Sequence, residues 1–255
     1  MDPVQETATG PRSVGAERGL TWLTEGWQPF ARAPGQWIAL TLLLLVAMTV
    51  CNALPVIGNL LSPFVYGVFA AATLLAARRA RDGTSTELLN DALAFGSHPA
   101  LKPVVIVSAI HLGLTLVAVM AGVLIMVAIS GLGALSSVIQ GDSGLLAGAL
   151  AGLLPGLLLM MLAMAAITAM YWFAIPDVVF RGTEPWTAMC RSLRACVGNA
   201  VPLLVYGVLC MIAFVLAVIP FGLGLLVMLP VLFGSWLASY EDVYGAVPQP
   251  PAPPP

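Results

Sequence analysis

Long apolar runs separated by short polar segments make up most of the chain. Six runs approach the roughly 20 residues that a helix needs to cross the hydrocarbon core of a bilayer. They cover residues 37–57, 60–77, 103–129, 147–173, 199–219 and 222–240. This pattern predicts an all-α, polytopic membrane protein with six transmembrane helices.

Pro/Gly turns divide these runs into pairs. The sequence "LPVIGN" joins the first run to the second, and "IPFGLG" joins the fifth to the sixth. Turn signals of this kind favour tight connections, so we expect three helical hairpins. Residues 130–146 join the third and fourth runs, and part of this connection is compatible with a position in the membrane interface.

An amphipathic segment on the cytoplasmic side precedes each expected hairpin. The first segment places apolar residues at helical spacing, at Leu20, Leu23, Trp27 and Phe30. Pro29 lies inside this segment, so we expect a break or kink near its end. The pattern predicts a helix with one apolar stripe.

The other two amphipathic segments show the same organisation. Thr84 and Glu87 have the spacing of a capping box in front of a short apolar stripe. The last segment carries its basic residues beside a stripe of Trp186, Met189, Cys190, Leu193 and Val197. Helices that combine Trp and Arg suit the membrane interface, but packing on the cytoplasmic ends of the spans explains the pattern equally well.

Segment and hairpin together form an approximate internal repeat. The units begin at "RGLTWL", "DGTSTELL" and "RGTEPW", and two of their exits read "IPDVVFRG" and "SYEDVYG". We place the three units at residues 17–82, 83–181 and 182–245. They divide one integral membrane domain, residues 17–245.

Both ends of the chain differ in composition from this domain. Residues 1–16 are polar, and residues 246–255 are rich in proline, so both are predicted to be disordered. The N-terminus lacks the apolar core of a cleavable signal peptide, and the first span is therefore expected to act as the insertion signal.

The ten Lys and Arg residues are distributed asymmetrically. All of them precede the first run, or lie between the second and third or between the fourth and fifth runs. The opposite loops contain Asp142 as their only charge. Because positive residues stay in the cytoplasm during insertion, we expect a bacterial inner-membrane protein with an even number of spans and both termini cytoplasmic.

These charges also predict a lipid-binding rim on the cytoplasmic side. Guanidinium groups there would meet lipid phosphates while Trp side chains enter the headgroup boundary. The predicted rim consists of Arg78, Arg79, Arg81, Arg191, Arg194, Trp22, Trp27 and Trp186.

Composition agrees with the membrane class. Hydrophobic residues make up 60% of the chain and charged residues 9%, whereas soluble domains carry about 25% charged residues. Such a chain cannot cover itself with a polar surface in water. Positive charge is too scarce to form a face for nucleic acid, which is therefore not an expected partner.

Candidate catalytic groups are scattered along the chain. "GDSG" at residues 141–144 looks like a serine-hydrolase fragment, but His98 is expected on the opposite side of the membrane. A chance Gly-rich turn therefore fits better. Cys190 and Cys196 are six residues apart, which is not a usual spacing for metal ligands. We expect neither enzyme activity nor a metal or cofactor.

His111 is the one Asp, Glu, Lys, Arg or His residue inside a confident span, which makes it a functional candidate. A neutral imidazole bonded to a neighbouring helix explains it better. The lack of intramembrane carboxylates counts against a proton- or sodium-coupled transporter.

A ladder of small residues predicts close helix packing. Gly144, Gly148, Gly152 and Gly156 recur every four residues and leave a flat stripe that another helix can approach. We favour the hypothesis that this stripe packs against a helix of the same chain. Formation of a homo-oligomer is the more specific alternative.

The stretches "WLTEGWQPFARAPGQWI", "SLRACVGNAVPLLVYG" and "SYEDVYG" resemble a family of uncharacterised multispanning inner-membrane proteins of proteobacteria. The resemblance covers the first and last thirds of the chain. More distantly, the layout of amphipathic helix and hairpin is similar to the membrane domains attached to some glycerophosphodiester phosphodiesterases. The resemblance implies a location and an architecture, and it transfers no active residues.

These observations favour a non-catalytic membrane protein that interacts with lipids or with other envelope proteins. The alternative is a transporter or channel for a small or amphiphilic molecule, and an enzyme comes third. A transporter should show an enclosed polar pathway reaching His111, whereas an enzyme should gather polar side chains in one pocket at the membrane edge.

Overall fold

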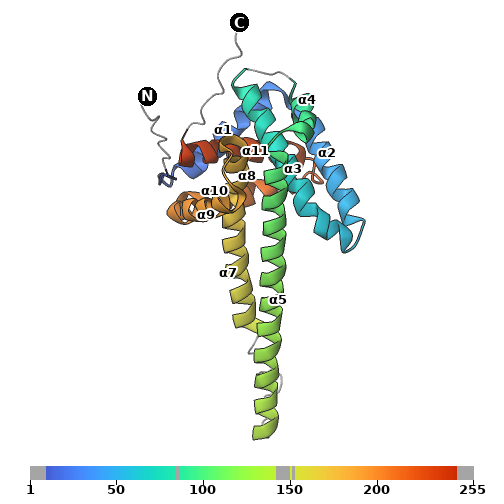
Figure 1. The fold of residues 1–255 in the computed structure, drawn as a ribbon, viewed down its shortest axis with the longest axis vertical. Coiled ribbons are helices and arrows are strands. Elements are labelled where there is room, and N and C mark those ends of the chain that lie inside the picture. The colour runs from blue at the N-terminus through green and yellow to red at the C-terminus, as the bar shows by residue number, and fades with distance from the viewer. Residues whose placement is uncertain (1–9, 84–86, 142–149, 151–152, 246–255) are drawn as a thin grey trace. The chain divides into compact units, whose positions relative to one another are not determined.

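The computed structural model describes residues 10–83, 87–141, 150 and 153–245. Every regular element in these residues is a helix, which confirms the all-α fold class (Figure 1). The chain divides into two compact units, which are described separately below. The core unit comprises residues 1–108 and 170–255, and the hairpin unit comprises residues 109–169.

The helices have the following bounds. The core unit contains α1 (Arg18–Arg32), α2 (Pro34–Asn52), α3 (Ile57–Arg81), α4 (Leu88–Leu93), the short 3-10 helix η1 (Ala94–Ser97), α8 (Ala174–Arg181), α9 (Pro185–Gly198), α10 (Ala200–Val218) and α11 (Leu225–Tyr244). Most of the hairpin unit belongs to two long helices, α5 (Leu101–Gln140) and α7 (Leu153–Trp172).

Local sequence explains where several of these helices begin and end. Pro34 and Pro185 stand in the first turns of α2 and α9, where the missing N–H has no helical partner to lose. The carboxylate of Glu184 caps α9 by accepting hydrogen bonds from the backbone N–H groups of Trp186 and Thr187, at 3.1 and 2.8 Å. Hydrogen bonding to Thr187 lowers the pKa of Glu184.

Five helical segments are long and apolar enough to cross a membrane. They are Pro34–Asn52, Ile57–Arg81, Leu101–Gln140, Leu153–Arg181 and Ala200–Val218. The sixth expected run forms α11, which is helical but is not among these candidate spans. Its C-terminal half is more polar than the other runs, because it includes Ser235, Ser239, Glu241 and Asp242. The predicted set of six spans is therefore matched by five candidates.

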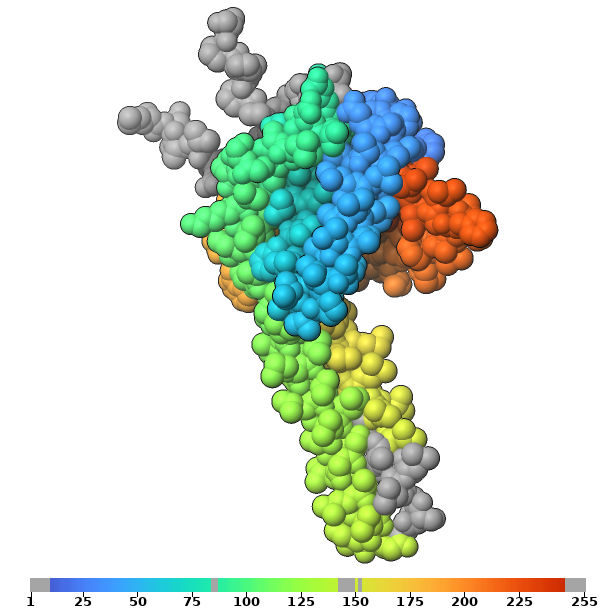
Figure 2. All heavy atoms as spheres, turned by 90° about the vertical axis from the view of Figure 1, so that its right-hand side faces the viewer, coloured from blue at the N-terminus to red at the C-terminus, as the bar shows by residue number. Residues whose placement is uncertain are grey.

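The helices of the core unit pack around α11. Twelve of its 20 residues are buried, and it contacts α1, α2, α3 and α10. In the space-filling view, α2 and the first half of α3 lie side by side on the outer surface of this unit (Figure 2). The polar residues that distinguish α11 from a lipid-facing span are thus mostly turned toward protein.

Helices α1 and α11 approach each other at backbone contact. A Cβ atom added to Gly26 would lie 2.4 Å from the carbonyl oxygen of Val231, and one added to Gly234 would lie 2.7 Å from the carbonyl oxygen of Gly26. Further contacts join Arg18 to Asp242, so the two helices run antiparallel. Only glycine permits this separation, because any side chain at either position would overlap main-chain atoms.

The buried face of α1 differs from the predicted stripe. The structure buries Gly19, Trp22, Gly26, Pro29 and Phe30, whereas Leu20 and Trp27 of the predicted stripe are exposed. The close approach at the glycines explains the difference, because it draws Trp22 between α10 and α11. Pro29 lies inside α1, which continues to Arg32, so the helix does not break at this residue.

In the hairpin unit, two contacts between a glycine and a methionine join α5 and α7 in one register. A Cβ atom at Gly122 would lie 3.1 Å from the side chain of Met160, and one at Gly156 would lie 2.8 Å from the side chain of Met126. Gly156 of the predicted glycine ladder therefore does face the other arm. The other ladder residues, Gly144, Gly148 and Gly152, lie outside the described residues.

Helix α5 is unusually long for a membrane span. Its 40 residues correspond to about 60 Å of helix, whereas the hydrocarbon core of a bilayer is about 30 Å thick. The helix includes part of the connection whose limits the sequence left open, residues 130–140.

The glycine contact between α1 and α11 predicts a strong effect of a single methyl group. The Gly26→Ala substitution should lower the free energy of unfolding by about 1–3 kcal/mol, because the new Cβ meets backbone atoms that cannot rotate away. Gly207→Ala on α10 is the matched control, since a Cβ there meets nothing within 4 Å. Thermal unfolding of the purified protein in detergent, followed by tryptophan fluorescence, measures both. Equal stability of the two variants would contradict this packing.

Candidate functional site

The candidate site comprises the charged and aromatic side chains at the ends of the core-unit helices. Most of its arginines are paired with carboxylates of the same chain. The ion pairs are Arg12–Asp242, Arg18–Asp242, Arg18–Glu25, Arg78–Asp82, Arg79–Asp91, Arg81–Glu241, Arg181–Asp177 and Arg191–Asp177. Much of the positive charge predicted to meet lipid phosphates is therefore already balanced within the protein.

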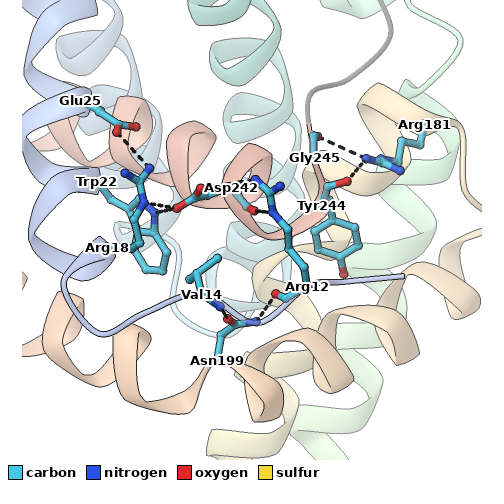
Figure 3. Close-up of polar contacts among 10 residues, drawn as sticks. All are labelled: Arg12, Val14, Arg18, Trp22, Glu25, Arg181, Asn199, Asp242, Tyr244 and Gly245. Atoms are coloured by element: carbon cyan, nitrogen blue, oxygen red, sulfur yellow. Dashed lines mark hydrogen bonds and ion pairs between the residues drawn. The ribbon is translucent and has the colours of Figure 1, made fainter. Parts of the chain in front are cut away.

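The first cluster is centred on Asp242 near the end of α11 (Figure 3). One carboxylate oxygen of Asp242 accepts hydrogen bonds from Nε of Arg18 and, at 2.9 Å, from Nε1 of Trp22. Arg12 lies 3.6 Å from the other oxygen. The hydrogen bond to Asp242 raises the pKa of Arg18. We call these four residues the Asp242 cluster.

Trp22 therefore belongs to the core rather than to the predicted rim. Its side chain is fully buried and packs edge-on against Tyr206, with ring centroids 5.9 Å apart. Its one polar atom is satisfied by Asp242. The indole is therefore not accessible to lipid.

The second cluster surrounds the fully buried carboxylate of Asp177 in α8. The hydroxyl of Tyr240 donates a hydrogen bond to it at 3.1 Å, and guanidinium nitrogens of Arg191 and Arg181 lie 3.7 and 3.9 Å away. Both arginines also stand over the ring of Tyr244, at 5.4 and 5.7 Å from its centroid. We call this group the Asp177 cluster, and Arg191 is one of its structural members.

The three arginines at the end of α3 connect that helix to three different neighbours. Arg78 stacks over the ring of Phe180 in α8, at 5.2 Å from its centroid. Arg79 bonds to Asp91 of α4 at 2.8 Å, and Arg81 bonds to Glu241 of α11. All three lie in the last turn of α3, where positive charge also interacts favourably with the helix dipole.

The outward face of α9 is different, because its large side chains have few protein contacts. Its buried face consists mainly of small residues, among them Ala188, Ser192 and Ala195. Trp186 is 50% exposed and Val197 70% exposed. Among the residues that the structure describes, no carboxylate lies within ion-pairing distance of Arg194, which is also exposed. Of the predicted rim residues, Trp27, Trp186 and Arg194 are exposed, as is Arg81, which is paired with Glu241.

The other candidate groups are His111, the cysteines and the sequence "GDSG". His111 is half-buried in the part of α5 that belongs to the hairpin unit. All four cysteines are free thiols, and burial raises the pKa of Cys196 to about 12. Within the described ranges, no group of three His, Cys, Asp or Glu residues is placed to hold a metal ion. Of "GDSG", only Gly141 is described.

Sequence reasoning did not identify the acidic centres of these clusters. Asp177 and Asp242 were noticed only as parts of the repeat exits "IPDVVFRG" and "SYEDVYG". A usable signal was present, because an aspartate that follows an apolar run needs a compensating charge when it is buried. The donors come from distant segments, with Trp22 and Asp242 separated by 220 positions.

By its architecture the chain is an all-α protein with several helices that could span a membrane. It is similar to a protein of Burkholderia thailandensis named as a probable inner membrane protein, with 28% identity over 94% of this chain and 95% of that protein. The name of this relative agrees with the resemblance of the sequence to inner-membrane proteins. No protein-family model matches the chain, and no solved structure matches it.

The two arginines of α9 should respond differently to neutralisation. Arg191→Gln removes a guanidinium from beside a buried carboxylate, so we expect a loss of about 1–3 kcal/mol in unfolding free energy. Arg194→Gln makes the same change of charge on the exposed face and should stay within about 0.5 kcal/mol of the wild type. Thermal unfolding of both variants in detergent tests this. A greater loss for Arg194→Gln would show that the pairing to Asp177 has been misjudged.

Proposed function

We propose that the protein is a non-catalytic, multi-pass protein of the bacterial inner membrane that binds lipid or another envelope protein through its cytoplasmic face. The outward face of α9 carries the proposal, because Trp186, Arg194 and Val197 are all exposed on it. Helix α9 ends at Gly198, and a single residue separates it from the candidate span α10. The name of the Burkholderia relative supports the membrane assignment.

Lipid binding by this face follows from its chemistry. An interfacial helix buries Trp and aliphatic side chains at the headgroup boundary while its basic residues meet lipid phosphates. Each basic residue near an anionic leaflet contributes about 1 kcal/mol. The spans already hold the protein in the bilayer, so this energy serves to recruit anionic lipid or to orient α9. Trp27 of α1 is a second exposed aromatic group suited to the same role.

The proposed topology has six spans and both termini in the cytoplasm. Arg12 and Arg18 lie before the first span and contact Asp242 at the end of α11. This contact supports an even number of crossings between the two parts of the chain. We propose that α11 adds a sixth crossing to the five candidate spans, in the hairpin α10–α11. The positive residues favour the cytoplasm as the shared side.

The threefold repeat also remains part of the proposal. Two of the expected unit exits carry an aspartate in the same context, Asp177 before "VVFRG" and Asp242 before "VYG". Each aspartate pairs with an arginine of another unit, Asp177 with Arg191 of the third unit and Asp242 with Arg18 of the first. The last exit thus meets the first unit in the way that the second exit meets the third unit.

The topology predicts opposite accessibility for two cysteine reporters. Gln140→Cys at the end of α5 should react with a membrane-impermeant maleimide added to intact spheroplasts. Glu17→Cys, just before α1, should react only after the membrane is permeabilised, because the two positions lie on opposite sides of a six-span protein. Both positions are exposed in the structure. Labelling of both reporters from outside would contradict the proposed topology.

The lipid-binding role predicts a loss of bound anionic lipid when α9 is altered. The double variant Trp186→Ala/Arg194→Gln should retain less phosphatidylglycerol or cardiolipin in native mass spectrometry, because it removes an exposed indole and an exposed guanidinium group. Arg81→Gln is the matched control, because it removes one positive charge that is already paired with Glu241. Equal lipid retention by the double variant and the wild type would remove the main support for lipid binding.

A further inference from the structure

The segment that precedes α1, residues 10–17, lies across the joint between α9 and α10 and the end of α11. We call this segment the strap. It has no regular secondary structure in residues 10–15, yet it is fixed by several hydrogen bonds to residues far away in the sequence (Figure 3). Neither the two acidic clusters nor the outward face of α9 accounts for these bonds.

Asn199, at the joint between α9 and α10, binds the backbone of the strap in two directions. Its Oδ1 accepts a hydrogen bond from the backbone N–H of Val14 at 2.8 Å, and its Nδ2 donates one to the carbonyl oxygen of Arg12 at 3.0 Å. Nδ2 also donates to the carbonyl oxygen of Ala195 at 2.9 Å. The carboxamide therefore pairs with the strap through one acceptor and one donor, as a neighbouring strand would.

The end of α11 supplies the other side of this arrangement. The backbone N–H of Arg12 donates to the carbonyl oxygen of Val243 at 2.8 Å, and its Nε donates to the carbonyl oxygen of Asp242. The carboxylate of Asp242 attracts the same guanidinium. The site thus recognises an extended backbone at Asn199 and Val243, and a basic side chain at Asp242.

The strap itself has little side-chain burial. Arg12 and Ser13 are exposed, and Val14 is partly exposed, whereas Asn199 is only 2% exposed. The fixed, buried part of the interaction therefore belongs to the site, and the occupant contributes mostly main-chain atoms and one charge. Contacts of this kind tolerate changes in the sequence of the occupant.

We propose that Asn199, Val243 and Asp242 form a docking site for an extended basic segment, which residues 12–14 occupy within the same chain. A partner protein that presents an extended segment with a Lys or Arg in the place of Arg12 would use the same bonds. This inference deepens the protein-binding part of the proposed function and rests on it. It does not involve the outward face of α9.

The strap competes with any such partner from a short tether. A tethered segment acts at an effective concentration in the millimolar range, so an external segment gains access only when the strap is weakened. Loss of the Arg12 side chain removes both contacts of its guanidinium to Asp242, while Asn199 and Val243 remain. The Arg12→Ala chain should therefore hold its strap less firmly, with only the main-chain bonds remaining, and leave the site intact.

A peptide-binding experiment on the full chain in anionic nanodiscs tests the proposal. A fluorescent peptide with the sequence of residues 9–17 is added to the wild type, to Arg12→Ala, and to Arg12→Ala/Asn199→Asp. We expect the peptide to bind Arg12→Ala at least about tenfold more tightly than the other two chains. Binding to Arg12→Ala should be lost when the arginine of the peptide is replaced by glutamate. Hydrogen exchange at Val14 reports release of the strap.

The possible outcomes separate this inference from its alternatives. Equal binding with and without Asn199, or no binding to Arg12→Ala despite rapid exchange at Val14, overturns the docking site. A strap that stays protected in Arg12→Ala shows that the basic side chain does not hold it, and also overturns the proposal. A wild-type dimer that the peptide dissociates would assign the site to a second copy of the chain instead.

Lipid retention distinguishes the docking site from the proposed lipid-binding function. Arg12→Ala/Asn199→Asp should retain anionic lipid like the wild type, because both residues lie off the outward face of α9. Trp186→Ala/Arg194→Gln/Arg12→Ala should still bind the peptide. Loss of lipid with intact peptide binding, or the reverse, therefore identifies which of the two ideas has failed.

Discussion

The core unit depends on the backbone contact between α1 and α11. Gly26 and Gly234 allow the two helices to approach so closely that main-chain atoms touch. This approach places Trp22 between α10 and α11 and brings its indole N–H to Asp242. Helix α11 also places Glu241 beside Arg81 of α3 and Tyr240 beside Asp177 of α8. A bulkier residue at either glycine would separate the surfaces on which these polar contacts depend.

Two physical demands act on the same arginines. In the topology that we propose, insertion keeps the positive residues on the cytoplasmic side. Folding then uses most of them to balance acidic groups that the helices bury or half-bury. Asp177 shows the second demand most clearly, since it is fully buried between two guanidinium groups and a tyrosine hydroxyl. Arg194 has no carboxylate within ion-pairing distance among the described residues. It is therefore the better candidate for contact with a lipid or a partner protein.

The sequence was a good guide to local structure and a poor one to long-range contacts. Apolar runs predicted the helical class and five of the six expected spans, because length and composition are local properties. The stripe predicted for α1 was wrong at Leu20 and Trp27, because hydrophobic periodicity assigns no weight to glycine, and glycine determined the packed face. Asn199 was not among the candidate residues. Its bonds to Arg12 and Val14, 185 or more positions away, could not be read from its neighbours.

The contact between the two ends of the chain has a consequence for biosynthesis. Trp22 and Asp242 are separated by 220 positions, and ribosomes add about 5–20 residues per second. The indole of Trp22 therefore leaves the ribosome roughly 10–45 seconds before its partner exists. During this interval α1 lacks both α11, against which it packs, and the carboxylate of Asp242. Helix α11 therefore completes the packing of α1, and a chain truncated before α11 would leave the buried face of α1 exposed to the quality-control proteases of the cell.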